Sequence, residues 1–490
     1  MLQVFYVHTK PMCYNKTKWG EGMVTKKNSI DMVNGPLWGK ILKFAALYML
    51  TAVLQHLYSA ADVIVVGRFA GKVALAGVGT CAVISNLFLN FILGLSAGAT
   101  IVLGQAIGAG TNNKGEVGKA THTAIAVAIG GGLIITAICL LFTKQLLGMI
   151  DVPQDVMPEA LDYLRVIAIG YVPSLVYNFG AAILRAKGDN KRALYIVTVS
   201  GIINVAFNLF FVCVLNMRAS GVATATVISQ VFTAAAILYI LRREPDETRV
   251  SLRKIRFYKK PLLKILKFGV PSGIQSSVYS ISNVLVQSSV NSFGPAAIAG
   301  AAATTSITDF YNVSVNSLYQ ASIVFVSQNF GAKKFDRIKK TILICSAYVA
   351  CLWAIQIAIT FLFGKTLLGI YAPNDPDTVK MGWIKLSLMG CTYGILGFMN
   401  VASGVLRGMG ASIINMITSI VGVCGIRILW IMTAFKEIGT FRSLYYCYPM
   451  SWIGTLILHS IMIAFVYKKE KSRLKVQQQY KFQQTESPGQ

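Results

Sequence analysis

An acidic residue lies inside an apolar stretch near the start of the chain, where it could bind and release a cation. The stretch runs from Ile41 to Val66, and Asp62 lies near its end. Gln55 and Tyr58 precede the acid by seven and four residues, so the three side chains share one face of a helix. An ionised carboxylate at membrane depth is costly, and it usually faces a bundle interior or a wet cavity. We therefore expect a cation-coupling site here; the alternative is an acid that only stabilises helix packing.

Two more charged residues lie in apolar runs of the second half. They are Asp309, within 296–326, and Arg427, within 412–435. Opposite charges at membrane depth commonly pair, so we expect these two to form a buried ion pair. In the alternative, Asp309 lines a substrate cavity and attracts cations.

The composition is that of a polytopic membrane protein. Of the 490 residues, 54% are hydrophobic and 13% are charged, whereas soluble proteins carry about 25% charged residues. Many of the apolar runs are long enough to cross a bilayer as helices. We expect an all-α membrane protein with about twelve transmembrane helices, at 41–66, 73–103, 120–143, 161–184, 193–217, 219–241, 265–291, 296–326, 341–363, 382–405, 412–435 and 444–467.

The net charge of +27 is a topology signal. Lys and Arg gather in short connections between apolar runs, such as 185–192, 242–264 and 333–340, so no nucleic-acid partner is expected. The positive-inside rule places these connections and both termini in the cytoplasm. We expect a multi-pass protein of the inner (plasma) membrane.

Cysteine and histidine usage gives no sign of a metal or a disulfide framework. The nine cysteines form no Cys-x-x-Cys pair, and the four histidines form no His-Glu-x-x-His motif. We expect no cofactor other than a coupling ion. A membrane-embedded enzyme would need a catalytic constellation at membrane depth, and a receptor would need a soluble output domain; the sequence indicates neither.

The chain repeats itself at an offset of 221 to 224 residues. Four short matches keep their order: KILKF at 40–44 and 264–268, QAIGA and QNFGA at 105–109 and 328–332, FTKQLLG and FGKTLLG at 142–148 and 363–369, and Leu-Arg at 184–185 and 406–407. Each half holds about six spans, so both halves enter the membrane in the same direction. This pattern predicts two parallel-repeat six-helix lobes that enclose a cavity and rock to open it to either side.

The repeat also predicts the domain boundaries. We expect an N-terminal cytoplasmic extension at 1–38, an N-lobe at 39–241, a cytoplasmic inter-lobe linker at 242–264, a C-lobe at 265–467 and a cytoplasmic tail at 468–490.

Several motifs together resemble the multidrug and toxic compound extrusion (MATE) family. They are QHLYSAAD at 55–62, VGRFAG at 66–71, GLSAGATIVLGQAIGAG at 94–110, GAAILRAKGD at 180–189, SQNFGAKK at 327–334 and ASGVLRGMG at 402–410. The resemblance implies a twelve-helix, two-lobed antiporter that exports organic, usually cationic compounds in exchange for Na⁺ or H⁺. It implies small-molecule substrates and the lipid bilayer as partners, and we expect a monomer.

A flippase for lipid-linked oligosaccharides or peptidoglycan precursors is the alternative within the same superfamily. Such a protein would have a more basic central cavity, for which Arg427 is the clear candidate in the sequence.

The chain is more similar to the DinF-like than to the NorM-like branch of the family. The DinF-like cation site implies roles for Asp62 with Tyr58, for Asn204 and for Thr226. A second acid often follows that Asn by four residues, and Asn208 occupies its position here. Oxygen ligands of this kind suit a hard cation, and protonation of the acid is the other way to neutralise it. With one acid, we expect the site to neutralise one Na⁺ or one H⁺; for the Asn pair, interhelical hydrogen bonding is the structural alternative.

Overall fold

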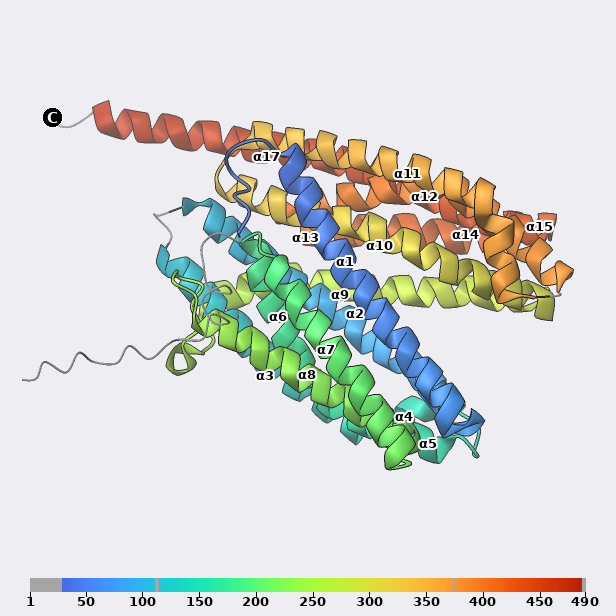
Figure 1. Cartoon of the computed structure of the whole chain (residues 1–490). Coiled ribbons are helices and arrows are strands. Elements are labelled where there is room, and N and C mark those ends of the chain that lie inside the picture. The colour runs from blue at the N-terminus through green and yellow to red at the C-terminus, as the bar shows by residue number, and fades with distance from the viewer. Residues whose placement is uncertain (1–28, 111–113, 151, 374, 487–490) are drawn as a thin grey trace, which may run out of the picture.

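The computed structural model describes residues 29–110, 114–150, 152–373 and 375–486, which form a bundle of long helices (Figure 1). The described residues contain no β-strand. Residues 1–28 of the expected N-terminal extension lie outside the described residues. The helices and π-helical segments are α1 (Trp38–Val65), η2 (Val66–Ala70), α2 (Lys72–Gly108), α3 (Lys114–Leu141), α4 (Thr143–Gly148), α5 (Met157–Ile169), α6 (Tyr171–Ala186), α7 (Lys191–Leu209), η4 (Phe210–Val214), α8 (Arg218–Arg242), α9 (Lys259–Asn291), α10 (Pro295–Gly331), α11 (Phe335–Tyr371), α12 (Pro376–Gly408), α13 (Ser412–Ser419), η6 (Ile420–Gly425), α14 (Ile426–Met432), α15 (Ala434–Ile438), α16 (Phe441–Tyr445) and α17 (Cys447–Glu486); η5 (Leu252–Lys254) is a 3₁₀ turn.

Every expected span coincides with a helix or a bent helix of this bundle. Within the described residues, nine helices are long and apolar enough to cross a membrane, or ten if the bent pair α5–α6 is one span. The expected spans 265–291 and 296–326 correspond to α9 and α10, which have 33 and 37 residues but are less apolar. Their Ser, Asn and Gln side chains line a cavity between the two halves, which explains the lower hydropathy.

Two expected spans are irregular. Residues 161–184 form α5 and α6, which meet at Gly170 with a bend of 44°. Residues 412–435 form α13 and α14 with the π-helical segment η6 between them. The apolar pattern shows where such spans lie, but a bend changes neither their length nor their hydropathy.

The two halves of the chain form two lobes that diverge away from one end of the bundle (Figure 1). We call this the linker end, because it carries residues 243–258 between α8 and α9. The first helix of each half begins against the other lobe. Ile41 and Phe44 of α1 are fully buried against α10 to α12, with the Phe44 and Phe325 rings 6.0 Å apart. Ile265 and Phe268 of α9 are buried among α2, α3 and their neighbours. The KILKF repeat thus marks two helix starts that are exchanged between the lobes, so the boundaries at 39 and 265 do not separate independent packing units.

The linker end is closed by contacts across the lobes, in which α2 bonds to α12 and α10 bonds to α6. Gln105 donates its side-chain amide to the carbonyl of Gly408, 3.0 Å away, and Gln328 donates to the carbonyl of Ala186, 2.6 Å away. The donors Gln105 and Gln328 occupy equivalent positions of the repeat, and so do the acceptors Gly408 and Ala186. One bond therefore runs from the N-lobe to the C-lobe and the other from the C-lobe to the N-lobe. A Cβ atom on Gly108 would lie 1.9 Å from the Gln328 carbonyl oxygen, so only glycine permits this approach.

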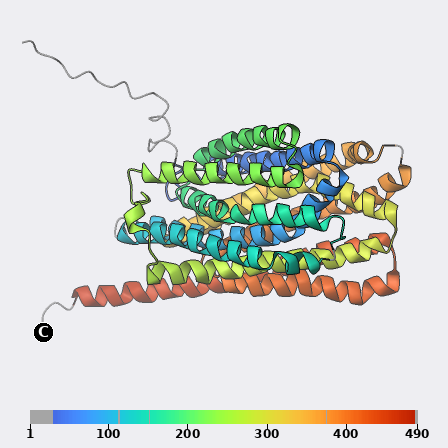
Figure 2. The same cartoon turned by 90° about the horizontal axis from the view of Figure 1, so that it is seen from below.

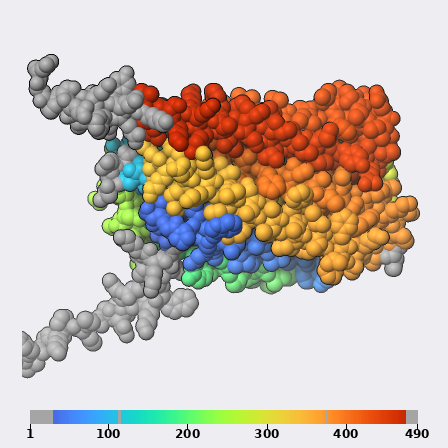
Figure 3. All heavy atoms as spheres, turned by 90° about the horizontal axis from the view of Figure 1, so that it is seen from above, coloured from blue at the N-terminus to red at the C-terminus, as the bar shows by residue number. Residues whose placement is uncertain are grey.

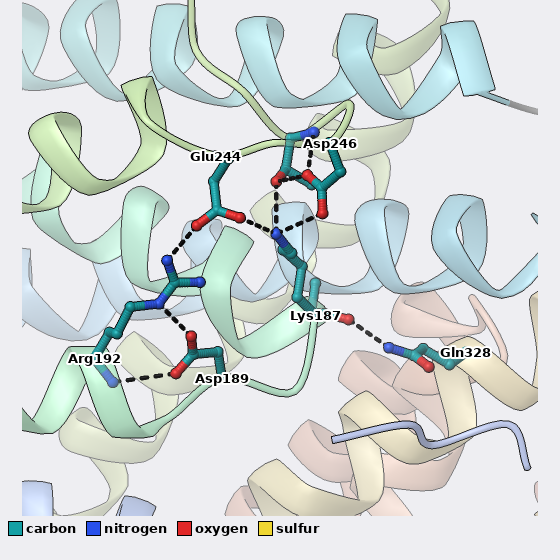
Figure 4. A network of polar contacts seen from close by, with 8 residues as sticks. Lys187, Asp189, Arg192, Glu244, Asp246 and Gln328 are labelled. Atoms are coloured by element: carbon teal, nitrogen blue, oxygen red, sulfur yellow. Dashed lines mark hydrogen bonds and ion pairs between the residues drawn. The ribbon is translucent and has the colours of Figure 1, made fainter. Parts of the chain in front are cut away.

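A network of charged side chains fixes the start of the linker beside this contact (Figure 4). Glu244 accepts hydrogen bonds from Lys187 and Arg192, and Arg192 also binds Asp189. A carboxylate oxygen of Asp246 lies 2.7 Å from the side-chain nitrogen of Lys187. Burial alone would raise the pKa of Asp246, but hydrogen bonds from Lys187 and Thr248 lower it below its usual value.

The segment before α1 is docked rather than loose. Met32 is fully buried, and its carbonyl accepts a hydrogen bond of 3.1 Å from Asn329 of the C-lobe. The Ile30 amide donates to Gly188 of the N-lobe at 3.3 Å. This segment and the start of α1 lie against the C-lobe on the surface (Figure 3). The described part of the expected extension therefore bridges the two lobes.

The expected tail continues the last helix. Helix α17 runs from Cys447 to Glu486 without interruption, and its end projects past the other helices at the linker end (Figure 2).

Candidate functional site

A cavity of about 420 Å³ lies between the lobes, and residues of both lobes line it. Its N-lobe wall includes Gln55 of α1 and Asn90 of α2, and its C-lobe wall includes Gln275 of α9 and Asn312 of α10. Gln55, which the sequence offered as a possible residue of a substrate cavity, is exposed and lines this space. The volume is in the range of drug-sized binding sites.

The residues expected to form the cation site are brought together inside the N-lobe. Asn208 donates from its side-chain nitrogen to a carboxylate oxygen of Asp62. The same nitrogen lies 3.3 Å from the side-chain oxygen of Asn204, whose own nitrogen lies 3.5 Å from the Thr226 hydroxyl. Asp62 is half-buried and both Asn residues are buried. The chain Asp62–Asn208–Asn204–Thr226 therefore joins α1, α7 and α8.

One oxygen of this cluster has no partner in the described structure. The side-chain oxygen of Asn208 is buried and accepts no hydrogen bond, although buried polar groups are nearly always satisfied. Together with the Asp62 carboxylate and the Thr226 hydroxyl, it offers the oxygen donors that a hard cation prefers. The donor set thus fits a small monovalent cation, and a proton on Asp62 would be the other way to neutralise it.

Tyr58 lies near the cluster but does not bind the acid. Its hydroxyl donates to the backbone carbonyl of Thr198 on α7, at 3.3 Å. Its ring covers Gly201, where a Cβ atom would lie 1.8 Å from a ring carbon. Tyr58 therefore sets how closely α1 packs on α7.

Irregular backbone lies next to the cluster on two helices. The π-helical segment η2 begins at Val66, four residues after Asp62, and η4 begins at Phe210, two residues after Asn208. Single π-turns within helices are frequent at functional sites. Here each begins within four residues after one of the two residues whose side chains meet.

The expected ion pair of the C-lobe is not formed. Among the described residues, the ion pairs do not include one between Asp309 and Arg427. Arg427 instead donates to Asn283 at 2.8 Å and to Ser451 at 3.3 Å. Asp309 is exposed, and both residues line a second cavity of about 410 Å³. The sequence placed both residues at membrane depth, but it could not fix the directions in which they point.

Three cationic residues of the two cavities were missed from the sequence as site residues. Lys385 lines the second cavity and donates to the Ala301 carbonyl at 3.0 Å. Its position as a lysine within the expected span 382–405 could have indicated a site residue. Arg185 and Arg407 line the inter-lobe cavity. The Leu-Arg repeat marked both positions, but it did not show what they face.

Comparison with known proteins identifies the family. The MatE family model matches residues 48–210 and 271–432, one match in each lobe. The chain belongs to the MatE family. The Bacillus subtilis relative described as "Probable multidrug resistance protein YoeA" is 25% identical over 462 residues, which cover 92% of this chain and 98% of the relative.

Solved structures of a MATE family transporter and of a MOP superfamily transporter share the fold. One described as an outward-facing conformation of a multidrug resistance MATE family transporter has a TM-score of 0.82 at 20% identity, and covers 91% of this chain and 99% of its own. A Pyrococcus furiosus transporter, whose description reports a binding pocket of reverse polarity, has a TM-score of 0.80 at 20% identity and covers 92% of this chain and 98% of its own. This MATE chain is therefore a multi-pass membrane protein with the two-lobed transporter fold.

Proposed function

We propose that this chain exports organic compounds by antiport, in exchange for one Na⁺ or one H⁺ that binds at Asp62. The observation that carries the proposal is the cluster of Asp62, Asn208, Asn204 and Thr226 beside a cavity shared by two lobes. Membership of the MatE family and the multidrug resistance relative from Bacillus subtilis support the export of small organic molecules. The position of the cluster in the first lobe favours the DinF-like branch.

Ion and substrate would bind at different places in this scheme. Among the described residues, the lining of the inter-lobe cavity includes Thr51 and Gln55 but not Asp62, which lies about two helical turns farther along α1. Helix α1 therefore carries both the cation cluster and part of the cavity wall, and its start packs on the C-lobe. A change of charge at Asp62 that alters α1 packing would bias the lobes toward one arrangement. The cation would then bind the two arrangements with different affinities, as coupling requires.

The basic connections favour a cytoplasmic linker end. With that end closed by Gln105 and Gln328, the described state would be closed to the cytoplasm, and both termini would lie inside. We place the protein in the plasma membrane as a monomer whose partners are small organic substrates and lipid.

The flippase alternative is less well supported. Arg185 and Arg407 make the inter-lobe cavity basic, as a flippase would require. Its volume of about 420 Å³, however, suits a compact solute better than a lipid-linked oligosaccharide. The multidrug resistance relative from Bacillus subtilis also favours the exporter.

Transport in proteoliposomes tests the proposal. We would impose Na⁺ and pH gradients separately on the purified wild-type protein and follow the movement of ethidium and norfloxacin. Uphill movement driven by one gradient and abolished by its dissipation is the expected result. Movement that only follows the substrate gradient, under both conditions, would contradict antiport.

A further inference from the structure

The inter-lobe cavity contains a pair of arginines that the ion-coupling scheme does not use. Arg185 lies in the last turn of α6 and Arg407 in the last turn of α12. They occupy equivalent positions of the internal repeat and line the same cavity, one from each lobe. Among the described residues that line this cavity, they are the only charged ones, and none is acidic.

Neither guanidinium group is neutralised. The ion pairs of the described residues include neither Arg185 nor Arg407. Arg407 donates to the side-chain oxygen of Gln275 at 2.7 Å, and Arg185 makes one long contact of 3.5 Å with the carbonyl of Asn178. Both arginines lie within two residues of the ends of the expected spans 161–184 and 382–405, and burying a charge without a counter-ion is costly.

Each arginine also has an unused donor. The Nε atoms of Arg185 and Arg407 are both buried without a hydrogen-bond partner in the described structure. The Arg407 side chain as a whole is 5% exposed. A buried N–H without an acceptor costs free energy, so an acceptor from a bound molecule would satisfy these groups.

A role in helix stability alone does not account for this arrangement. Cations in the last turn of a helix are favourable because they face the negative end of the helix dipole. Yet neither guanidinium hydrogen-bonds a carbonyl of its own last turn, and both reach the cavity. The neighbouring side chains that line it are neutral amides, hydroxyls and tyrosines, which suit a polar aromatic solute.

We propose that the inter-lobe cavity binds an organic anion, whose carboxylate or phosphate group is held between Arg185 and Arg407. The inference rests on the proposed export function and replaces the cationic substrate that the family resemblance implies. Guanidinium groups bind carboxylates and phosphates in bidentate geometry, with greater strength than neutral donors. One anion between the two arginines would bind to both lobes at once.

The position of the pair connects binding to the closed end of the cavity. Arg185 immediately precedes Ala186, whose carbonyl accepts the bond from Gln328, and Arg407 immediately precedes Gly408, which accepts from Gln105. An anion between the arginines would therefore bind directly above the inter-lobe contacts of the linker end. Its release would leave two like charges facing each other there, which favours separation of the lobes.

Equilibrium binding to the purified, full-length protein tests the charge preference. We would titrate fluorescein (a carboxylate), riboflavin 5′-phosphate and rhodamine 123, a cation of the same ring system as fluorescein, and follow fluorescence polarisation. The wild type is expected to bind one or both anions more tightly than the cation. Arg185→Gln and Arg407→Gln should each weaken anion binding by about tenfold to a hundredfold and leave rhodamine binding unchanged. Tighter binding of rhodamine, with both variants at wild-type anion affinity, would overturn the inference.

The matched control is Arg442→Gln, because Arg442 is an exposed arginine of α16 away from the cavity. It should bind all three probes as the wild type does. Size-exclusion elution and thermal stability show whether a variant has folded. If Arg407→Gln fails this check, the anion affinities of Arg185→Gln, at a half-buried position, and of the conservative Arg407→Lys variant test the inference instead.

Transport in proteoliposomes separates this inference from the proposed function. Gradient-driven transport of rhodamine alone would overturn the anion site and leave the antiporter standing. Arginine-dependent binding of an anion without transport under either gradient would support the site and contradict the antiporter.

Discussion

At the residue scale, the proposed function depends on a few polar groups that an apolar environment leaves incompletely satisfied. Asp62 receives one hydrogen bond from Asn208, and the Asn208 oxygen receives none. A solvated site would tolerate this, but within a lobe each unmet group favours a bound cation or proton. The acid was evident from the sequence because it interrupts an apolar run. Its hydrogen-bond partner was suggested by family resemblance and by the helical spacing of the two Asn residues.

Replacing Asn208 by Leu should weaken ion coupling. The change removes the hydrogen bond to Asp62 and one oxygen ligand, and hydrogen bonds to charged groups contribute about 1.5–3 kcal/mol. We expect the Na⁺ or H⁺ concentration for half-maximal transport to rise by about tenfold or more. The control is Asn291→Leu, at an exposed position near the end of α9. Unchanged ion dependence in Asn208→Leu would exclude this residue from the site.

Replacing Gly201 by Ala should destabilise the N-lobe. The new methyl group would overlap the Tyr58 ring, and forced overpacking costs about 1–3 kcal/mol. The control is Gly79→Ala on α2, where a Cβ atom would meet nothing within 4 Å and where alanine favours the helix. We expect a lower midpoint of thermal unfolding for Gly201→Ala and an equal or higher one for Gly79→Ala. A Gly201→Ala protein as stable as the wild type would show that α1 and α7 can move apart freely.

At the element scale, the sequence predicted the helices better than their partners. Apolar length located the spans, including the interrupted stretch 161–184, because a helix needs about 20 apolar residues to cross a bilayer. It could not show that Phe44 and Phe268 pack on the opposite lobes, since a repeat establishes equivalence and not contact. The predicted pairing of Asp309 with Arg427 was wrong because depth in the membrane does not fix the direction in which a side chain points.

Breaking the two Gln contacts should open the linker end. Each bond is worth about 1 kcal/mol, so Gln105→Leu and Gln328→Leu together should shift the equilibrium between lobe states by roughly tenfold or more. Spin labels at the linker-end termini of α2 and α10, measured by pulsed electron resonance, should show a longer-distance population. Gln287→Leu is the control, because Gln287 bonds only within its own helix. Identical distance distributions in the double variant and the wild type would mean that other contacts keep this end closed.

The start of the linker should loosen only in acid. Because the folded-state pKa of Asp246 is lowered, its ion pair with Lys187 stabilises the network above the ordinary Asp pKa of about 3.9. That contribution is lost as the pH falls through the lowered value. Hydrogen exchange of the amides at 246–250, corrected for intrinsic rates, should stay constant from pH 8 to 5 and accelerate below about pH 4. Asp246→Asn should exchange fast at every pH; a wild-type transition near neutral pH would contradict this assignment.

At the scale of the whole molecule, duplication gives each lobe the same elements for different tasks. The N-lobe has the carboxylate and amide cluster, whereas the C-lobe has Asp309, Lys385 and Arg427 around a second cavity. The equivalent arginines, by contrast, face one cavity from both sides. The two-lobed architecture and the position of Asp62 within an apolar run could be predicted from apolar runs and the repeat, whereas the partners of Asp62 were suggested by the family resemblance. The charge of the inter-lobe cavity could not be predicted, because it depends on whether the charged side chains at the helix ends face the cavity.

The most direct test of this account compares the acids of the two lobes during transport. Asp62→Asn and Asp309→Asn make the same chemical change, and only the first alters the cation cluster. In proteoliposomes with an imposed Na⁺ or pH gradient, Asp62→Asn should lose uphill transport to the level of protein-free vesicles and still bind substrate, and Asp309→Asn should retain gradient-driven uphill transport. Uphill transport at the wild-type rate by Asp62→Asn would contradict the central claim that charge neutralisation at this acid drives export.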